Sequence, residues 1–314
     1  MRTCWVIDHP AHFQLFAPWI RAGEEGDILI VAERDELDLM LENAPLPERE
    51  VIRVPRPVGR AAFIRAHERM DTVRSRLRKK GIERIIVKGA SLELRVAKRL
   101  GIAERWYLSD TESNSLAHRL AKGSATDVVL PLNWLGGPVA TAARQHRYPG
   151  ILPHAYLQPP ERVEKSTGER EQRSRKPLVF RRDLLGGGIH DRNELVDYSE
   201  LADRLPVDFD SVGEGEAGDW DLPTRLLEYN GVLTGSTTLA AEAACQGIPT
   251  LLISRAQRGF LAGLPALYRD NQSKQWFESL NSEPTSPDQW PETLATLQAL
   301  WGPTQLSQSR RMSV

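Results

Sequence analysis

The chain has 314 residues and a mass of 35.3 kDa, more than one hydrophobic core usually supports, so two domains are expected. Apolar residues make up 40% of it and charged residues 26%, which excludes a disordered or collagen-like protein. The formal net charge of -1 indicates no polyanionic partner. The two cysteines, Cys4 and Cys245, lie in apolar stretches, which excludes a disulfide framework or a thiolate metal cage.

Membrane and export signals are missing from the sequence pattern. No uninterrupted apolar run approaches the roughly 18 residues that a transmembrane helix needs. Asp8 and His9 interrupt the N-terminus where a signal peptide would have its apolar region. We therefore expect a cytoplasmic protein.

The first half of the chain alternates short β-branched runs with helical patterns, which is typical of a parallel sheet with crossover helices. The helical segments are long enough to return each following strand parallel to the last. This half predicts a doubly wound α/β domain over residues 1–157. The expected strands are 3–7, 27–32, 51–54, 84–88, 105–108 and 127–130, and the expected helices are 13–22, 60–80 and 91–100.

Residues 158–176 are rich in proline and charge and have no apolar periodicity, which indicates a linker or an exposed loop. The alternation then resumes, so residues 177–314 form a second Rossmann-like domain in this interpretation. Its last helix, at about 292–301, could pack against either domain. The other expected strands are 178–180, 207–212, 231–234 and 249–253, and the helices are 193–204, 222–229 and 237–246.

The strongest functional signal is a strand that ends at Gly235, followed at once by a helix that opens at Ser236. First-turn amides, here near Thr237 and Thr238, lack intrahelical acceptors and lie at the positive end of the helix dipole, so they favour a pyrophosphate. Glu242 lies nearly two turns along, where its carboxylate could accept hydrogen bonds from ribose hydroxyls. In the alternative, Ser236 is only an N-cap and Glu242 is a solvated helix residue.

The same segment carries a family resemblance. Ser236, Glu242, Ala243, Gly247 and Pro249 match the Ser-x5-Glu-Ala-x3-Gly-x-Pro pattern of the C-terminal domain of GT-B glycosyltransferases and of non-hydrolysing UDP-N-acetylglucosamine 2-epimerases.

More closely, the chain resembles the prokaryotic family named domain of unknown function 354, of that superfamily, over most of residues 5–262. This resemblance implies two Rossmann-type doubly wound domains in a GT-B-like arrangement around a cleft. The nucleotide-diphosphate sugar bound there would be a substrate, with no separate cofactor. The matching segments are 7–12, 95–102, 110–112, 148–150 and 155–157.

Two arginines follow the first strand of the second domain. Where the epimerases have His-Arg-Arg-Glu, this chain has Phe180, Arg181, Arg182 and Asp183. Phe180 would replace a polar group of the epimerase site, which weakens an epimerase interpretation. Arg181 and Arg182 could neutralise a diphosphate, or they could be a solvated basic pair.

The turn after the first strand contains Asp8, His9 and His12, at the sheet edge where ligands of open α/β sheets bind. His9 or Asp8 could deprotonate an acceptor hydroxyl, since imidazole titrates near neutral pH. Alternatively, His9 only caps the next helix. A metal site is not expected, because His9 and His12 have no third ligand at a characteristic spacing.

Two carboxylates, Asp110 and Glu112, follow another strand of the first domain and could divide acid and base roles. The alternative is that Asp110 caps the following helix. The Asp-x-Asp sequences at 208–210 and 219–221 are discounted as metal motifs because neither has the expected neighbouring elements.

One expected helix is strongly basic. Residues 65–80 contain seven Lys or Arg residues and two acidic residues, a net charge of +5. A solvated face is one interpretation, and peripheral contact with anionic lipid is the other. Nucleic acid is not an expected partner, because no aromatic residues are interleaved with these cations.

Together these features predict a GT-B-like glycosyltransferase, inverting and metal-independent, that uses a nucleotide-diphosphate sugar such as a UDP-sugar. The second domain would bind the nucleotide, and the first would present the acceptor and the base. The acceptor would be lipid-linked or a small sugar. Two alternatives remain open, a nucleotide-sugar epimerase and a non-catalytic nucleotide-sugar-binding protein.

Overall fold

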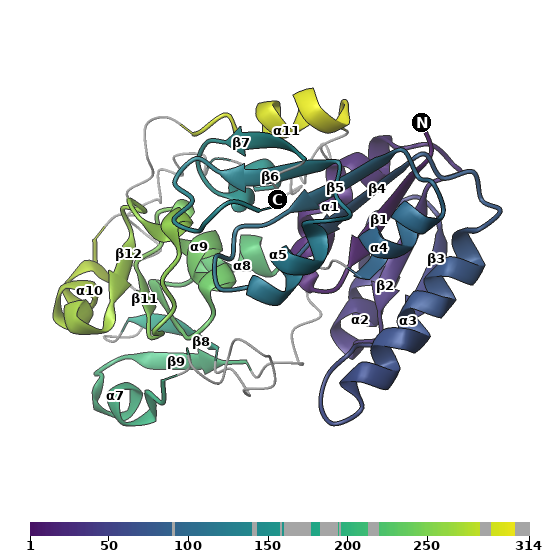
Figure 1. Cartoon of the computed structure of the whole chain (residues 1–314). Helices are drawn as coiled ribbons and strands as arrows, with labels where there is room; N and C mark the ends of the chain where they lie inside the picture. Colours follow the sequence, from purple (N-terminus) through teal and green to yellow (C-terminus); the bar gives the residue numbers. More distant parts are fainter. Residues whose placement is uncertain are drawn as a thin grey trace. The chain divides into compact units, whose positions relative to one another are not determined.

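The computed structural model divides the chain into two compact units (Figure 1). The first unit comprises Met1–Tyr156, Arg258–Phe260 and Glu292–Val314, and the second comprises Leu157–Gln257 and Leu261–Pro291. Of the expected linker, only Pro159 lies within the described residues, and Asp183 and Asp219 lie outside them. The structure describes residues 1–89, 92–139, 143–157, 159, 177–182, 194, 196–212, 220–282 and 290–304.

The N-terminal unit contains a seven-stranded sheet in the order β3-β2-β1-β4-β5-β6-β7. Every strand pair in it is parallel. Strands β1 and β2 are buried along their whole length, which is why they read as unbroken apolar runs. The strands are β1 (Thr3–Ile7), β2 (Ile28–Ala32), β3 (Glu50–Val54), β4 (Arg84–Lys88), β5 (Glu104–Leu108), β6 (Asp127–Pro131) and β7 (Arg144–Tyr148).

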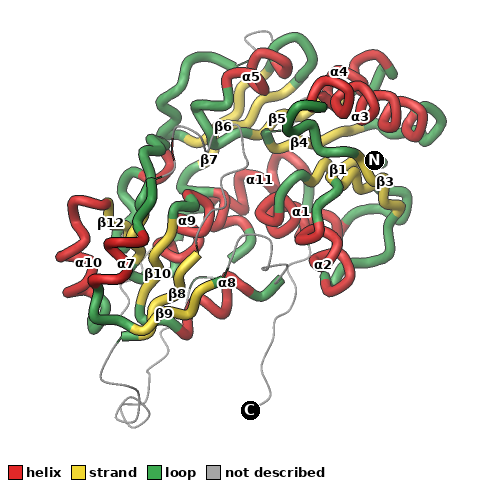
Figure 2. The backbone as a smooth tube through the Cα atoms, turned by 90° about the horizontal axis from the view of Figure 1, so that it is seen from below, coloured by secondary structure: helices red, strands yellow, loops and turns green. Residues whose placement is uncertain are grey.

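Helices cover both faces of this sheet (Figure 2). One face is covered by α1 (Pro10–Ala22), α2 (Asp35–Asn43) and α11 (Thr293–Trp301). The other is covered by α3 (Ala62–Leu77), α4 (Leu92–Arg99) and α5 (Ser115–Ala121), over a continuous apolar core. Among the helices that the structure describes, none combines the length and the apolar character that crossing a bilayer requires.

The six strands expected for this unit are confirmed, and their ends differ by at most one residue. Two elements were not expected. Strand β7 has the polar sequence RQHRY and buries only Tyr148, so it lacks the apolar run by which the other strands are recognised. Helix α2 has three acidic residues in its first turn and only a short buried face.

The second unit contains a five-stranded parallel sheet in the order β12-β11-β10-β8-β9. Its helices also divide between the faces, with α8 and α9 over one core and α7 and α10 over the other. Strand β12 and helix α10 were not expected from the sequence. The elements are β8 (Leu178–Arg182), α7 (Ser199–Arg204), β9 (Asp208–Ser211), α8 (Leu222–Arg225), β10 (Gly231–Thr234), α9 (Thr237–Cys245), β11 (Thr250–Leu252), β12 (Leu267–Arg269) and α10 (Ser273–Ser279).

The last helix, which the sequence counted within residues 177–314 but left free to pack against either domain, belongs to the N-terminal unit. Trp301, only 5% exposed, lies among the rings of four aromatic residues, at centroid separations of 5.2 to 6.4 Å. Burial of this aromatic surface explains the placement of α11. The four residues are Trp5, Phe16, Trp19 and Trp106.

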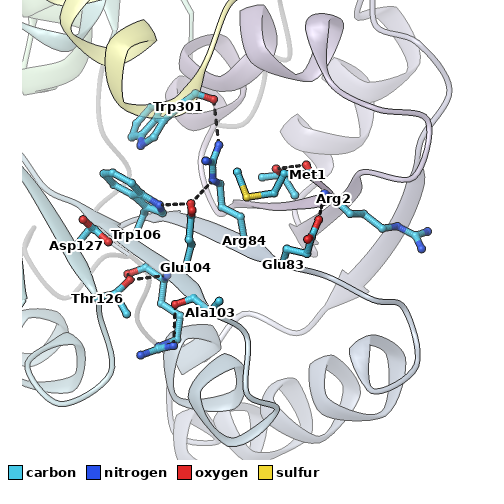
Figure 3. Close-up of polar contacts among 12 residues, drawn as sticks. Met1, Arg2, Glu83, Arg84, Ala103, Glu104, Trp106, Thr126, Asp127 and Trp301 are labelled. Carbon is cyan, nitrogen blue, oxygen red and sulfur yellow. Dashed lines mark hydrogen bonds and ion pairs between the residues drawn. The ribbon is translucent and has the colours of Figure 1, made fainter.

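Polar contacts at the amino ends of the strands fix the same helix (Figure 3). Arg84 Nη1 donates to the carbonyl oxygen of Trp301 at 3.0 Å, and Arg84 Nε contacts Glu104 at 2.6 Å. Glu104 also accepts from the indole N–H of Trp106 at 3.1 Å. The carbonyl at the C-terminus of α11 is therefore satisfied by a side chain of the sheet.

Replacing Trp301 by alanine should destabilise the N-terminal unit by about 3 to 5 kcal/mol, the usual cost of removing a buried tryptophan. Chemical denaturation followed by circular dichroism would measure this loss. The exposed Ala295 on the same helix gives a control, Ala295→Ser, which should change stability by less than about 0.5 kcal/mol. A Trp301→Ala midpoint equal to that of the control would contradict the placement of α11.

Candidate functional site

The strand order of the second unit reverses between β8 and β10, with β9 on one side and β11 and β12 on the other. In open parallel sheets, ligands bind at the carboxyl ends of the strands that flank such a reversal. Arg182, the last residue of β8, pairs in register with Thr234, the last residue of β10. The segment that the sequence indicated as an anion site therefore begins at the switch point of this sheet.

The amino end of α9 follows directly from β10. Ser236 is the N-cap, and its Oγ accepts from the Leu239 amide at 3.3 Å, so its capping role is confirmed. Thr234 Oγ1 accepts from the Ser236 amide at 3.0 Å. Within the described residues, the amides of Thr237 and Thr238 have no acceptor. These two first-turn donors are available to an anion, beside the buried Gly235.

The two arginines lie on opposite faces of the sheet. Arg181 packs its guanidinium over the rings of Tyr198 and Phe209, at 5.7 and 5.8 Å, on the face covered by α7. Because successive side chains of a strand point to opposite faces, Arg182 lies on the other face of the sheet. This is the face of Phe180, which packs with α8 and α9. Only Arg182 therefore lies on the same face as the amino end of α9.

Arg182 has an unusual donor. Its Nε is buried and has no hydrogen-bond partner among the residues that the structure describes. The carbonyl oxygen of the same residue accepts from Thr234 Oγ1 at 3.1 Å and from the Tyr198 hydroxyl at 2.8 Å. A buried, unsatisfied donor costs about 1 to 3 kcal/mol, so an acceptor from a ligand would stabilise this arginine.

Glu242 is only 6% exposed, so the alternative that it is a solvated helix residue is wrong. It lies in a helix whose residues from Leu239 to Cys245 are all buried. Burial, and then the charge of Glu242, raise the pKa of the Cys245 thiol. The helix ends as expected before Gly247, which has φ of 80°, a left-handed conformation that favours glycine.

Phe180 is a core residue, fully buried and edge-on to the ring of Tyr229 at 5.2 Å. Tyr229 donates its hydroxyl hydrogen bond to Asp210, the second aspartate of one Asp-x-Asp sequence. In the part of the chain that the structure describes, no three His, Cys, Asp or Glu residues are grouped as metal ligands would be.

In the N-terminal unit, the first candidate, Asp8, is part of a buried ion network. Its Oδ1 lies 2.6 Å from Arg69 Nη2, and Arg69 Nε also donates to Glu93 Oε1. Arg69 is 2% exposed and Glu93 1% exposed, whereas Asp8 is 27% exposed. Burial alone would lower the pKa of Arg69, but the two carboxylates outweigh burial and raise it.

Both histidines of the first turn use Nδ1 as an acceptor. His9 accepts from the Ala11 amide at 3.2 Å and is the N-cap of α1, which confirms its capping role. His12 accepts from the Asp8 amide at 3.3 Å. Burial, followed by the nearby charge of Lys88, holds the pKa of His12 well below its usual value. A neutral imidazole that accepts at Nδ1 has its proton on Nε2, so the neutral ring of His12 has a donor at Nε2.

Asp110 and Glu112 have different environments, so the structure does not pair them. Asp110 Oδ1 lies 3.1 Å from Lys88 Nζ and accepts from Thr111 Oγ1 at 3.2 Å. The alternative that Asp110 caps the following helix is wrong, since the N-cap of α5 is Asn114. Asp110 therefore belongs to an ion pair at the carboxyl ends of β4 and β5.

Glu112 instead joins two backbone segments of the unit. Its Oε1 accepts from the amides of Leu135, at 3.3 Å, and Gly259, at 3.0 Å. Asn133 Nδ2 donates to the carbonyl oxygen of Gly259 at 2.6 Å. A Cβ at position 259 would lie 1.9 Å from the Asn133 carbonyl oxygen, so only glycine permits this approach.

The basic helix is not uniformly solvated. Arg69 is buried in the ion network and, with Val73 and Leu77, forms the inward stripe of α3. The remaining exposed cations are Arg65, Arg74, Arg76, Arg78 and Lys79.

The backbone role of Glu112 is open to direct measurement. In Glu112→Ala, the amides of Leu135 and Gly259 lose their acceptor, and their hydrogen exchange should become about tenfold faster or more. Glu112→Gln retains a carbonyl oxygen and should preserve most of the protection. Unchanged exchange at both amides in the alanine variant, with Val129 of β6 as the reference, would contradict the role.

Comparisons with known proteins support the fold rather than a family. No family model and no curated protein match the chain, so the resemblance to domain of unknown function 354 is not confirmed. Solved structures do match. A UDP co-structure of S. aureus MnaA has a TM-score of 0.65 at 11% identity, over 96% of this chain and 95% of that one.

Two other solved structures match over nearly the whole chain. The UDP-GlcNAc 2-epimerase of Neisseria meningitidis, bound to UDP-GlcNAc, has a TM-score of 0.63 at 11% identity, over 96% of this chain and 98% of its own. The spinosyn forosaminyltransferase SpnP has a TM-score of 0.52 at 15% identity, over 96% of this chain and 94% of its own. The chain therefore has two Rossmann-like parallel-sheet units, as in the GT-B fold of these proteins.

Proposed function

We propose that the protein is a GT-B-like glycosyltransferase whose donor is a nucleotide-diphosphate sugar. The observation that carries the proposal is the switch point of the second sheet. There, the amides of Thr237 and Thr238, which have no acceptor among the described residues, and the buried Nε of Arg182 lie at the ends of the adjacent strands β10 and β8, on one sheet face. Donors of this kind suit the oxygens of a diphosphate.

The nucleotide is proposed to be UDP. Structural neighbours support this choice, because one is a complex with UDP and another a complex with UDP-GlcNAc. Glu242, on the same helix as the free amides, would accept hydrogen bonds from the ribose.

The proposed reaction is an inverting transfer without a metal. As the bond from sugar to diphosphate breaks, negative charge develops on the leaving group. The two amides and Arg182 would stabilise that charge as fixed dipoles and a fixed cation. The structure thus favours Arg182 over Arg181 for this task, since Arg181 is held against Tyr198 on the other face.

The N-terminal unit would bind the acceptor and supply the base. The candidates remain Asp8, His9, Asp110 and Glu112, all at the carboxyl edge of its sheet. The acceptor is proposed to be a lipid-linked molecule or a small sugar. Contact with an anionic membrane is supported by Phe63 at the start of α3, whose side chain is 77% exposed beside the basic residues of that helix.

Two alternatives differ in what they require. An epimerase is favoured by the higher TM-score of the UDP-GlcNAc 2-epimerase structure, but where the epimerases have a histidine this chain has the buried core residue Phe180. A non-catalytic nucleotide-sugar-binding protein would bind UDP-sugars without turnover. Release of UDP in proportion to added acceptor would distinguish the transferase from both.

The nucleotide site can be tested with a matched pair of arginine variants. UDP at about 100 times its dissociation constant should stabilise the protein by about 2.7 kcal/mol in a thermal-shift assay. Arg182→Met should weaken UDP binding by about tenfold or more, the value of a lost charge-assisted hydrogen bond. Arg181→Met keeps the packing on Tyr198 and should change affinity by less than about threefold. Equal losses of UDP affinity in Arg182→Met and Arg181→Met would show that Arg182 is not part of the proposed site.

The absence of a metal requirement is a separate expectation. Because amides and an arginine form the proposed diphosphate site, EDTA should leave sugar transfer unchanged when acceptors are assayed. Transfer that stops on chelation and returns with magnesium or manganese would refute the metal-free mechanism.

A further inference from the structure

The sheet of the N-terminal unit has its own switch point. Its order, β3-β2-β1-β4-β5-β6-β7, reverses between β1 and β4, so the carboxyl ends of these two strands flank the position where open α/β sheets bind ligands. Asp8 is the first residue after β1, and Lys88 is the last residue of β4. Four polar side chains from four elements are grouped here. Asp8 contacts Arg69 and, through its amide, His12; Arg69 contacts Glu93, and the charge of Lys88 acts on His12.

Among the described residues, only one oxygen of the Asp8 carboxylate has a hydrogen-bond partner. Oδ1 is held by Arg69, whereas Oδ2 has no hydrogen-bond partner among the described residues. Because Arg69 is itself bound to Glu93 and almost fully buried, Asp8 is held at a fixed position. One acceptor atom therefore remains available on a partly exposed side chain.

His12 supplies the complementary group. Its Nδ1 is occupied by the Asp8 amide, so the neutral ring has its hydrogen on Nε2, which has no partner within the described part of the chain. The turn thus presents an acceptor from Asp8 and a donor from His12. The hydrogen bond from the Asp8 amide to His12 Nδ1 links the two residues. A hydroxyl donates and accepts at once, as do two neighbouring hydroxyls of one sugar, whereas an anion would be repelled by Asp8.

The cost of the network argues against a purely structural role. A buried ion triad seldom stabilises a fold more than apolar residues of the same size would. Within the described part of the chain, this triad also leaves Glu93 Oε2 buried without a hydrogen-bond partner. Its effect is to fix the orientation of Asp8, which is what a binding site requires.

We propose that Asp8 and His12 bind a sugar hydroxyl at the β1–β4 switch point, with Arg69 as the positioning residue for Asp8. This rests on the proposed function, in which the N-terminal unit binds the hydroxyl-bearing acceptor. The ligand class is a neutral sugar or polyol.

Imidazole NMR of the full-length protein tests the site without turnover. The probes are glucose and N-acetylglucosamine, added to protein with labelled histidines. The resonances of His12 should show Nδ1 unprotonated and should shift saturably with at least one probe. Those of His146, which contacts Asp127 at the amino edge of the same sheet, should not shift. No response of His12 to either sugar would overturn the proposal.

Variants separate binding from folding. Asp8→Asn should raise the apparent dissociation constant of the probe by about tenfold or more, since a charged acceptor is lost. The double variant Arg69→Met/Glu93→Leu removes both buried charges, so the fold should persist while probe binding weakens to a similar degree. Equal probe affinity in Asp8→Asn and in the wild type would also overturn the proposal, even if the double variant fails to fold.

Adding UDP to the same samples distinguishes this inference from the proposed function. A wild-type protein whose His12 responds to sugar, but which binds no UDP, would refute the nucleotide site and leave the hydroxyl site standing. UDP binding without any response of His12 to sugar would refute the hydroxyl site and leave the nucleotide site standing.

Discussion

Parallel strand pairing is the constraint on which the candidate sites depend. Because every strand of a parallel sheet runs in the same direction, all carboxyl ends lie at one edge, and the turns that follow them gather there. Asp8, Asp110 and Glu112 follow strands of the first sheet, whereas Arg182 and Ser236 follow or end strands of the second. Residues far apart in sequence thus come together without any local motif linking them.

The two sheet edges differ in their charges. In the second unit, the amides of Thr237 and Thr238 and the buried Nε of Arg182 have no acceptor among the described residues, and such donors suit an anion. At the switch point of the first unit, two cations are already matched, Arg69 by Asp8 and Glu93 and Lys88 by Asp110. The first edge therefore favours a neutral polar ligand. This division agrees with a donor that carries a diphosphate and an acceptor that presents a hydroxyl.

Periodicity predicted the parallel sheets because buried strands need unbroken apolar runs, and it missed β7, whose edge position permits a polar sequence. Turn residues such as Asp8 and Ser236 were found because their positions follow from strand ends. Their partners were not, because Arg69 and Glu93 meet Asp8 only through tertiary packing. The sequence did contain one signal. Arg69 stands four residues before Val73, in the stripe that α3 buries.

The central claim is that the amino end of α9 binds a nucleoside diphosphate. The most direct measurement is the change of backbone amide chemical shifts on titration with UDP. The largest saturable shifts are expected at the amides of Thr237 and Thr238, and the Nε–H resonance of Arg182 should shift at the same UDP concentrations. Saturable UDP binding that leaves these three signals unmoved, or no binding at all, would contradict it.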